Sequence, residues 1–313
     1  MNPGPGRAVG RRQAAGSPRG YVGPMPHVIS SDATVLTLRT QGADDGPIVV
    51  LVNGLGMTTD SWGRVPELLA DRHRVVRYDL RGHGRSGNAP ADDYSLEAHA
   101  QDLAAVLADV VPDGEQAVVV GNSLGGGIIV VHARDLGLDR IGGVVFAGSG
   151  GSGVTFAGFP ADGLPPMARR IVRRSWLKAL RLVAVVANRV RPFEPLADRL
   201  VRKFAFEPGA PEAAVAQVRE DFMGSRRVPL ARTTLASVST NGVRYASALT
   251  VPTLVLHGEH DPEVPQQEID ELMPELADGE LVQLPGAGHM VALTRAEETA
   301  EQIARWVRRV RAG

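Results

Sequence analysis

The stretch AVVVGNSLGGGIIVVHARDLG (117–137) decides the fold, because it joins an apolar strand pattern to an apolar helix pattern through one glycine-rich turn. Residues 117–122 predict a strand buried on both faces, and residues 128–137 predict a helix. The turn at 121–125 has the pattern Gly-x-Ser-x-Gly, whose outer glycines allow a sharp bend that holds Ser123 out over the sheet edge. Alternatively, Ser123 only caps the helix, since serine is a favoured N-cap residue.

Further apolar runs predict a sheet around this strand. Helical patterns separate most of them, and strands that alternate with helices predict right-handed crossovers and a mostly parallel central β-sheet with helices on both faces. Segment 28–42 indicates one or two early strands, and 94–111 predicts an amphipathic helix. The runs are IVVLVN (48–53), RVVRYD (74–79), IGGVVFAG (141–148), TLVLHG (253–258) and ELVQLP (280–285).

The domain organisation follows from where this alternation stops. Residues 1–25 are rich in glycine, proline and arginine, which predicts a flexible N-terminal tail. Residues 153–246 contain helical patterns and no convincing buried strand. They predict a helical cap inserted into an α/β core made of 26–152 and 247–313.

The C-terminal segment of the core carries its own start signal for a helix. Thr294 and Glu297 have the spacing of a capping box, which predicts a final helix that ends near Arg311.

Composition limits the classes of function. The 34 lysines and arginines nearly balance the 35 aspartates and glutamates, so no overall field would attract nucleic acid. The chain has no cysteine, which excludes disulfides, thiol nucleophiles and thiolate metal sites. No secretory signal and no apolar run of about 18 residues is visible. We therefore expect a cytoplasmic protein without an integral membrane segment, and a homo-oligomer is compatible with the sequence.

Two later loops supply the partners that a serine nucleophile needs. The hydroxyl requires a general base, and the base requires a carboxylate that fixes its tautomer. Asp261 and His289 each follow a predicted strand, so both are expected at the sheet edge where ligands bind in open α/β sheets. Glu259 is an alternative acid, and the other seven histidines are weaker candidates for the base.

The chain order serine, aspartate, histidine, together with five ordered motifs, resembles the α/β-hydrolase superfamily from about residue 27 to residue 311. The resemblance implies a serine hydrolase with nucleophile Ser123, base His289 and acid Asp261, and it implies no metal and no organic cofactor. The motifs are VNGLG (52–56), DLRGHGRSG (79–87), GNSLGG (121–126), HGEHDPEVP (257–265) and PGAGHMV (285–291).

The resemblance also implies an oxyanion hole. Its donors would be the backbone amides of Leu124, beside the nucleophile, and Leu55, in the loop after an early strand. Asn53 stands where the family usually has histidine, and it can brace the loop by hydrogen bonds. Asn53, Gly54 and Met290 are expected to contact the substrate.

The motif at 79–87 and the insertion have weaker links to chemistry. Asp79 and Arg81 are expected to lock loops together.

The basic segment 169–181 fits a solvated helix face better than a site for an anionic substrate or a lipid surface. The aromatic side chains of the insertion would suit an apolar acyl or aromatic group, or would form the insertion's own core. They are Phe156, Phe159, Trp176, Phe193, Phe204, Phe206 and Phe222.

These features together predict hydrolysis of a carboxylic ester, or a similar acyl bond, of a small apolar substrate through an acyl-enzyme. The same triad also serves thioesterases, carbon–carbon bond hydrolases and cofactor-free haloperoxidases. A serine at position 123 argues against epoxide hydrolases and haloalkane dehalogenases, which in this family would need aspartate there. A non-catalytic small-molecule receptor of the same fold is the alternative from another class.

Overall fold

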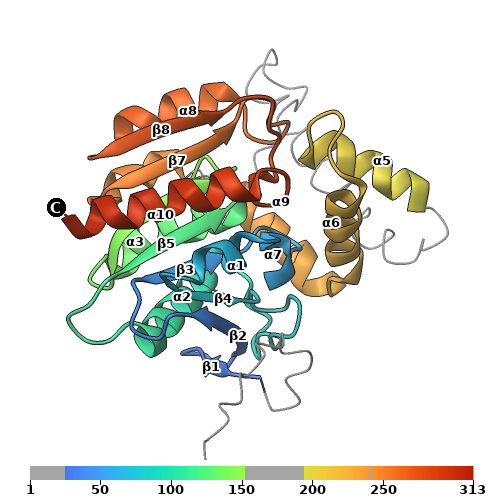
Figure 1. The fold of residues 1–313 in the computed structure, drawn as a ribbon. Coiled ribbons are helices and arrows are strands. Elements are labelled where there is room, and N and C mark those ends of the chain that lie inside the picture. The colour runs from blue at the N-terminus through green and yellow to red at the C-terminus, as the bar shows by residue number, and fades with distance from the viewer. Residues whose placement is uncertain (1–24, 152–193, 240–241, 313) are drawn as a thin grey trace, which may run out of the picture.

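The computed structural model describes residues 25–151, 194–239 and 242–312. They form a central eight-stranded sheet in the order β1-β2-β4-β3-β5-β6-β7-β8 (Figure 1). The strands from β4 to β8 in this order run parallel, and β1 and β2 at one edge are antiparallel to their neighbours. The predicted α/β class with a mostly parallel sheet is confirmed. The strands are β1 His27–Ile29, β2 Val35–Gly42, β3 Ile48–Val52, β4 Arg74–Tyr78, β5 Ala117–Asn122, β6 Ile141–Ala147, β7 Thr253–Gly258 and β8 Gly279–Leu284.

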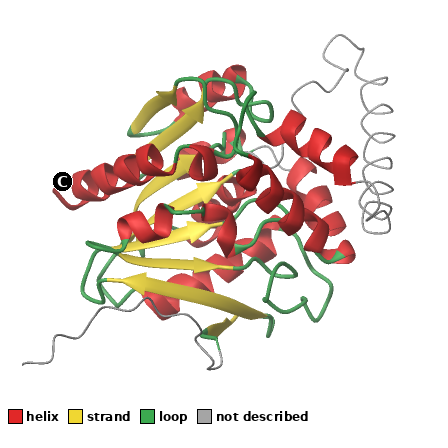
Figure 2. Ribbon diagram, turned by 45° about the vertical axis from the view of Figure 1, so that its right-hand side comes forward, coloured by secondary structure: helices red, strands yellow, loops and turns green. Residues whose placement is uncertain are grey.

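Helices cover both faces of the sheet, as Figure 2 shows. The helices of the core are α1 Val65–Leu69, α2 Leu96–Val110, α3 Leu124–Leu136, α8 Gln266–Leu272, α9 Val291–Thr294 and α10 Ala296–Ala312. Short 3₁₀ helices lie at η1 Thr59–Trp62, η3 Val243–Ala248 and η4 Met273–Glu275.

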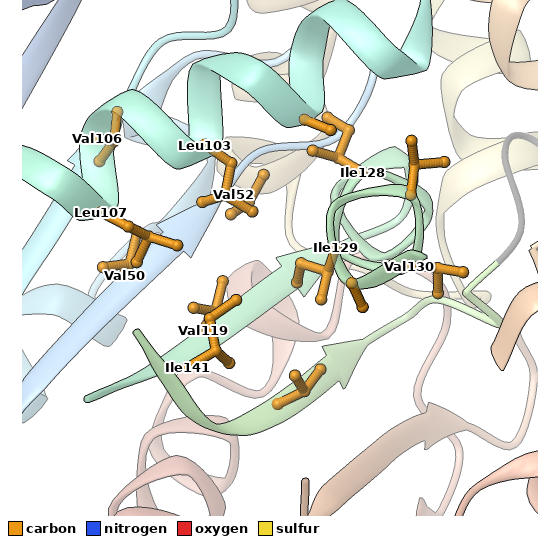
Figure 3. Close-up of a cluster of buried hydrophobic side chains, with 14 of the residues drawn as sticks. Val50, Val52, Leu103, Val106, Leu107, Val119, Ile128, Ile129, Val130 and Ile141 are labelled. Atoms are coloured by element: carbon orange, nitrogen blue, oxygen red, sulfur yellow. The ribbon is translucent and has the colours of Figure 1, made fainter. Parts of the chain in front are cut away.

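The central strands are apolar throughout because both of their faces are buried. Along β3, Val50 and Val52 belong to a cluster with α2, α3 and α8, whereas Val49 and Leu51 belong to a second cluster with α1, α9 and α10. This alternation is the two-residue period of a strand. In Figure 3, side chains of α2 and α3 pack over Val50, Val52 and Val119 of the sheet. Continuous apolar runs of this kind are typical of parallel strands between two helical layers.

A helical insertion lies between β6 and β7. Its described helices are α5 Glu194–Ala205, α6 Glu212–Gly224 and α7 Arg227–Ser239. The boundaries 153–246 stay a prediction, because residues 152–193 lie outside the described part of the chain. The same is true of the basic segment 169–181, of Phe156, Phe159, Trp176 and Phe193, and of nearly all of the predicted tail. None of the helices in the described ranges is long and apolar enough to cross a membrane.

The capping box predicted before the last helix is wrong. Thr294 is the final residue of α9, its hydroxyl donates to the Met290 carbonyl at 3.4 Å, and α10 begins only at Ala296. Glu297 is also engaged elsewhere, because its carboxylate pairs with Arg64 at 2.5 Å. Thr294 therefore belongs to the short helix α9, and Glu297 pairs with Arg64, so the two residues do not form the predicted capping box.

The scaffolding role predicted for the loop after β4 is confirmed. The carboxylate of Asp79 accepts hydrogen bonds from the backbone amides of Thr59 and Arg85, both at 2.8 Å. Arg81 donates to both oxygens of Asp102 at 2.7 and 2.6 Å, and the two side chains are almost fully buried. These contacts fix the loops that flank the carboxyl ends of the central strands.

Candidate active site

The site lies where the order of the sheet changes direction. The chain leaves β3 toward β4 on one side and then returns to form β5 on the other side of β3. The loops that follow β3 and β5 therefore leave the same edge next to each other, which is where open α/β sheets bind ligands. The loop after β3 contains Leu55, and Ser123 directly follows β5.

Ser123 has a strained backbone, with φ 49° and ψ −117°. This left-handed conformation is costly for a residue with a side chain. Glycines make the turn feasible, because a Cβ at Gly121 would lie 2.6 Å from the Gly125 backbone and one at Gly125 would lie 2.4 Å from the Val52 carbonyl. Ser123 precedes α3, yet its side chain makes no capping hydrogen bond. The hydroxyl is therefore not used to cap the helix.

His289 and Asp261 meet at the ends of β8 and β7. The imidazole Nδ1 lies 2.9 Å from Asp261 Oδ2 and 3.1 Å from Oδ1, and both side chains are almost fully buried. Asp261 Oδ1 also accepts the backbone amides of Glu263 at 2.8 Å and Val264 at 2.9 Å. The carboxylate is therefore held in place, and it fixes the orientation of the imidazole ring.

Burial and charge act in opposite directions on this pair. Burial opposes ionisation of Asp261, but attraction to His289 and the hydrogen bonds from the ring and two amides bring the pKa of Asp261 below its ordinary value. Burial also lowers the pKa of His289, but the nearby carboxylates of Asp261 and Glu263 outweigh it and raise that pKa well above the ordinary value. The site therefore stabilises an imidazolium at His289.

Glu263 approaches the other ring nitrogen, a contact that the sequence did not suggest. Its Oε2 lies 3.0 Å from His289 Nε2. The approach is an ion-pair contact rather than an aligned hydrogen bond, since within the described residues Nε2 has no partner at hydrogen-bonding geometry. The imidazole thus lies between two carboxylates.

The loop after β6 supports the serine turn. Ser149 Oγ donates to the Ser123 carbonyl at 2.7 Å, and a Cβ at Gly148 would lie 2.2 Å from the His289 carbonyl. The sequence of this loop, GSGG (148–151), is rich in glycine. Its structural role is close packing between the serine turn and the histidine loop.

The two residues predicted to donate to an oxyanion lie directly after Ser123 and in the loop after β3. Leu124 is the first residue of α3, so its amide has no partner within the helix. Leu55 lies in the loop after β3. A Cβ at Gly54 would lie 2.9 Å from Asn122 Oδ1 and 3.3 Å from Ser123 Cβ, which shows how closely this loop approaches the serine. No described residue accepts a hydrogen bond from either leucine amide.

Asn53 braces this loop from inside the protein. Its side-chain amide donates to the Tyr78 carbonyl at 3.0 Å, and its oxygen accepts the indole N–H of Trp62 at 2.6 Å. The side chain is completely buried. A contact between Asn53 and a substrate would therefore have to come from its backbone.

Met290, the residue after the histidine, lies against the insertion. Its backbone amide donates to the Ala205 carbonyl at 3.3 Å, and its buried side chain belongs to an apolar cluster with Met57 and Phe206. Glu207 accepts the amide of Gly288 at 2.9 Å from the same side. The segment after α5 thus packs directly on the histidine loop.

The alternative acid and two of the alternative bases have other surroundings. Glu259 Oε2 accepts the Gly286 amide at 2.9 Å, and the carboxylate that meets the imidazole is Asp261. Burial lowers the pKa of His83 to about 4, and it also lowers the pKa of the buried His99. Both side chains pack inside the core. The described residues contain no group of three or more histidine, aspartate or glutamate side chains arranged to hold a metal ion.

Comparison with known proteins shows the family of the chain. The model of the alpha/beta hydrolase family matches residues 49–302. The chain belongs to the alpha/beta hydrolase family. This alpha/beta hydrolase is 26% identical over 289 residues to a bifunctional esterase/perhydrolase from Acinetobacter calcoaceticus, an alignment that covers 91% of the chain and 100% of that relative. It is 29% identical over 279 residues to a non-heme haloperoxidase from Rhodococcus erythropolis, with 87% and 96% covered.

Solved structures show the same fold for this alpha/beta hydrolase. An esterase from Exiguobacterium antarcticum matches with a TM-score of 0.76 at 20% identity, and the match covers 91% of the chain and 100% of that structure. At this identity the similarity establishes the fold alone.

Proposed function

We propose that this alpha/beta hydrolase cleaves carboxylic esters of small apolar acids or alcohols through an acyl-enzyme on Ser123. The observation that carries the proposal is the buried His289–Asp261 pair at 2.9 Å, placed at the same sheet edge as the strained serine. A serine on a strand-to-helix turn and a carboxylate-bound histidine are the parts that acyl transfer requires.

In the first step, His289 Nε2 takes the proton of Ser123 as the serine oxygen bonds to the ester carbonyl carbon. The oxyanion that forms accepts hydrogen bonds from the Leu55 and Leu124 amides, and each such donor is worth about 10²- to 10³-fold in rate. The bond to the alcohol oxygen then breaks, and His289 returns the proton to the leaving alkoxide. The product is an acyl group on Ser123 and a free alcohol.

In the second step, water replaces the alcohol. His289 takes a proton from the water as its oxygen attacks the acyl carbon, and the serine oxygen leaves with that proton. Asp261 stabilises the imidazolium in both steps and keeps the ring in the required tautomer. Neither step needs a metal or an organic cofactor.

The apolar character of the substrate is inferred from the insertion. The cluster of Met57, Phe206, Met290 and their neighbours lies between the insertion and the loops after β3 and β8. Its partly buried members, Val201, Phe222 and Leu293, would recognise a chain or ring of carbon atoms by burial of apolar surface, which contributes roughly 25 cal/mol per Å².

Perhydrolysis is the second candidate reaction. The full-length similarity to a bifunctional esterase/perhydrolase and to a haloperoxidase favours it. Hydrogen peroxide would attack the same acyl-enzyme in place of water, so that the bond to Ser123 breaks and a percarboxylic acid leaves. The hypothesis needs no residue beyond those of the ester reaction.

The test is hydrolysis of p-nitrophenyl esters of increasing acyl length by the wild type and by Ser123→Ala. We expect the wild type to act on some of them and Ser123→Ala to lose activity by at least about 10⁴-fold. The acyl length with the highest kcat/KM would report the size of acyl group that the site accepts. Peracid formation from the acid and hydrogen peroxide tests the second candidate on the same two proteins. Equal activity of the two proteins would exclude Ser123 as nucleophile.

A further inference from the structure

The contact between Glu263 and His289 is on the side of the ring where the reaction takes place. Asp261 holds Nδ1, so only Nε2 can exchange a proton with Ser123 or with a substrate. Glu263 Oε2 lies 3.0 Å from that nitrogen. The second carboxylate therefore stands at the position that the serine hydroxyl must use.

We propose that Glu263 is a positioning residue that holds the imidazole of His289 in its cationic form in the free enzyme. During the reaction Glu263 moves away from Nε2, so that the Ser123 hydroxyl can approach this nitrogen. The inference rests on the proposed function, because it concerns the base of that reaction. Glu263 would thereby control the protonation state of His289, in addition to the effect of Asp261.

The two carboxylates differ in their access to solvent. The Asp261 side chain is 0% exposed and accepts two backbone amides in addition to the ring. The Glu263 side chain is 27% exposed. Asp261 is therefore held away from solvent, whereas the Glu263 carboxylate borders solvent, into which it would move when a substrate or the serine hydroxyl takes its place.

The charge around His289 favours the cation. Burial lowers the pKa of His289, and the carboxylates of Asp261 and Glu263 raise it by more. The neighbouring loop after β6 contributes Gly148, which carries no charge. Among the residues that the structure describes, the titratable groups that face this segment are Asp261 and Glu263 from the loop after β7, His257 from β7 itself, and Glu207 from the segment after α5, which accepts the Gly288 amide.

A protonated imidazole cannot accept the serine proton. The imidazolium must therefore release a proton to solvent, and Glu263 must leave Nε2, before Ser123 can attack. Removing the charge at position 263 would allow the neutral ring at a lower pH. The acidic limb of kcat/KM reports this ionisation in the free enzyme.

The test is Glu263→Gln, which keeps the size of the side chain and removes its charge. Histidine-labelled protein is followed by NMR as a function of pH, with the His289 signal identified by its absence in His289→Asn. The pH profile of kcat/KM for a p-nitrophenyl ester is measured in parallel. Glu271→Gln is the matched control, because Glu271 lies exposed on α8 and pairs with Gln267.

We expect the midpoint of His289 and the acidic limb both to move down by about 1 to 3 pH units in Glu263→Gln, and neither to move in Glu271→Gln. In Glu263→Asp, whose carboxylate is one methylene shorter, both values should lie between those of the wild type and those of Glu263→Gln. This graded result would show that the shift does not come from a folding defect. An unchanged His289 midpoint would overturn the proposal. So would a shifted midpoint with an unmoved acidic limb, because Glu263 would then have no part in the reaction. If the wild type hydrolyses no ester, the NMR titration still decides whether Glu263 holds the imidazolium.

Discussion

Asp221 of α6 accepts hydrogen bonds from both the backbone amide of Thr58, at 3.1 Å, and its hydroxyl, at 3.0 Å. Thr58 follows the loop that contains Leu55, so this carboxylate ties the insertion to the loop of the proposed oxyanion hole. Ser225, at the end of α6, adds a hydrogen bond to the Gly56 carbonyl at 2.9 Å. The position of the loop and the docking of α6 are therefore coupled.

Docking of α6 should depend on pH. Burial raises the pKa of Asp221 from 3.8 to about 6, although the hydrogen bonds from Thr58 oppose this shift. The folded state binds the proton of Asp221 more tightly than the unfolded state does. The contribution of Asp221 to the free energy of unfolding is therefore fully present below the ordinary pKa and is lost as pH rises through about 6. From about pH 4 to pH 7, the free energy of unfolding of the wild type should fall by about 1 to 2 kcal/mol relative to Asp221→Asn, allowing for solvent screening. Urea denaturation across this range measures it, and parallel curves for the two proteins would contradict it.

The ion pair between Arg81 and Asp102 should be necessary for stability. Both side chains are almost fully buried, so Asp102→Ala removes the buried partner of the Arg81 cation and leaves it paired with the partly exposed Asp32 at 2.9 Å, which should cost about 3 kcal/mol in the free energy of unfolding. Asp113→Ala removes an exposed partner of Arg140 and should cost less than about 1 kcal/mol. Denaturant titration of both variants makes the comparison. Similar losses in the two would show that burial does not decide the effect.

Asn53 should support the loop through hydrogen bonds that alanine cannot make. Asn53→Ala leaves the Trp62 indole N–H and the Tyr78 carbonyl without these partners inside the core, at about 1 to 3 kcal/mol for each unsatisfied group. Gln116→Ala is the control, since that side chain donates to an exposed carbonyl at Asp139. Thermal or denaturant unfolding would reveal the difference. A stable Asn53→Ala protein with unchanged Trp62 fluorescence would refute the bracing role.

The choice of acid can be tested on two side chains of one loop. Asp261→Asn should lower kcat/KM by about 10³- to 10⁴-fold, because an amide no longer fixes the required tautomer of His289 or stabilises its cation. Glu259→Gln should lower it by less than about threefold, because Glu259 contacts the Gly286 amide and an amide oxygen can still accept that hydrogen bond. Steady-state kinetics on one ester, with circular dichroism to check folding, separates the two. Equal losses would contradict the assignment of Asp261.

Much of the core could be predicted because its signals are local. A strand buried on both faces must be apolar at nearly every position, so the runs at 48–53 and 117–122 were visible in the sequence and correspond to β3 and β5. The serine turn was visible too, since its glycines are required by contacts within a few residues or with the adjacent strand.

The contacts that the sequence did not reveal join distant segments. Glu263 meets His289 only because the loops after β7 and β8 fold toward each other, and no spacing or periodicity encodes that approach. Asp221 meets Thr58 only once α6 has packed on the core. The capping box at Thr294 failed because Thr294 ends α9 instead of preceding α10, and Glu297 pairs with Arg64, far away in the chain.

The central claim is that Ser123 is a nucleophile activated by His289. Labelling with a fluorophosphonate probe, followed by intact mass measurement and peptide mapping, tests it without any assumption about the substrate. The account predicts one adduct on the wild type, located at Ser123, no adduct on Ser123→Ala, and much slower labelling of His289→Ala. A wild-type protein that stays unlabelled, or an adduct at another residue, would contradict it.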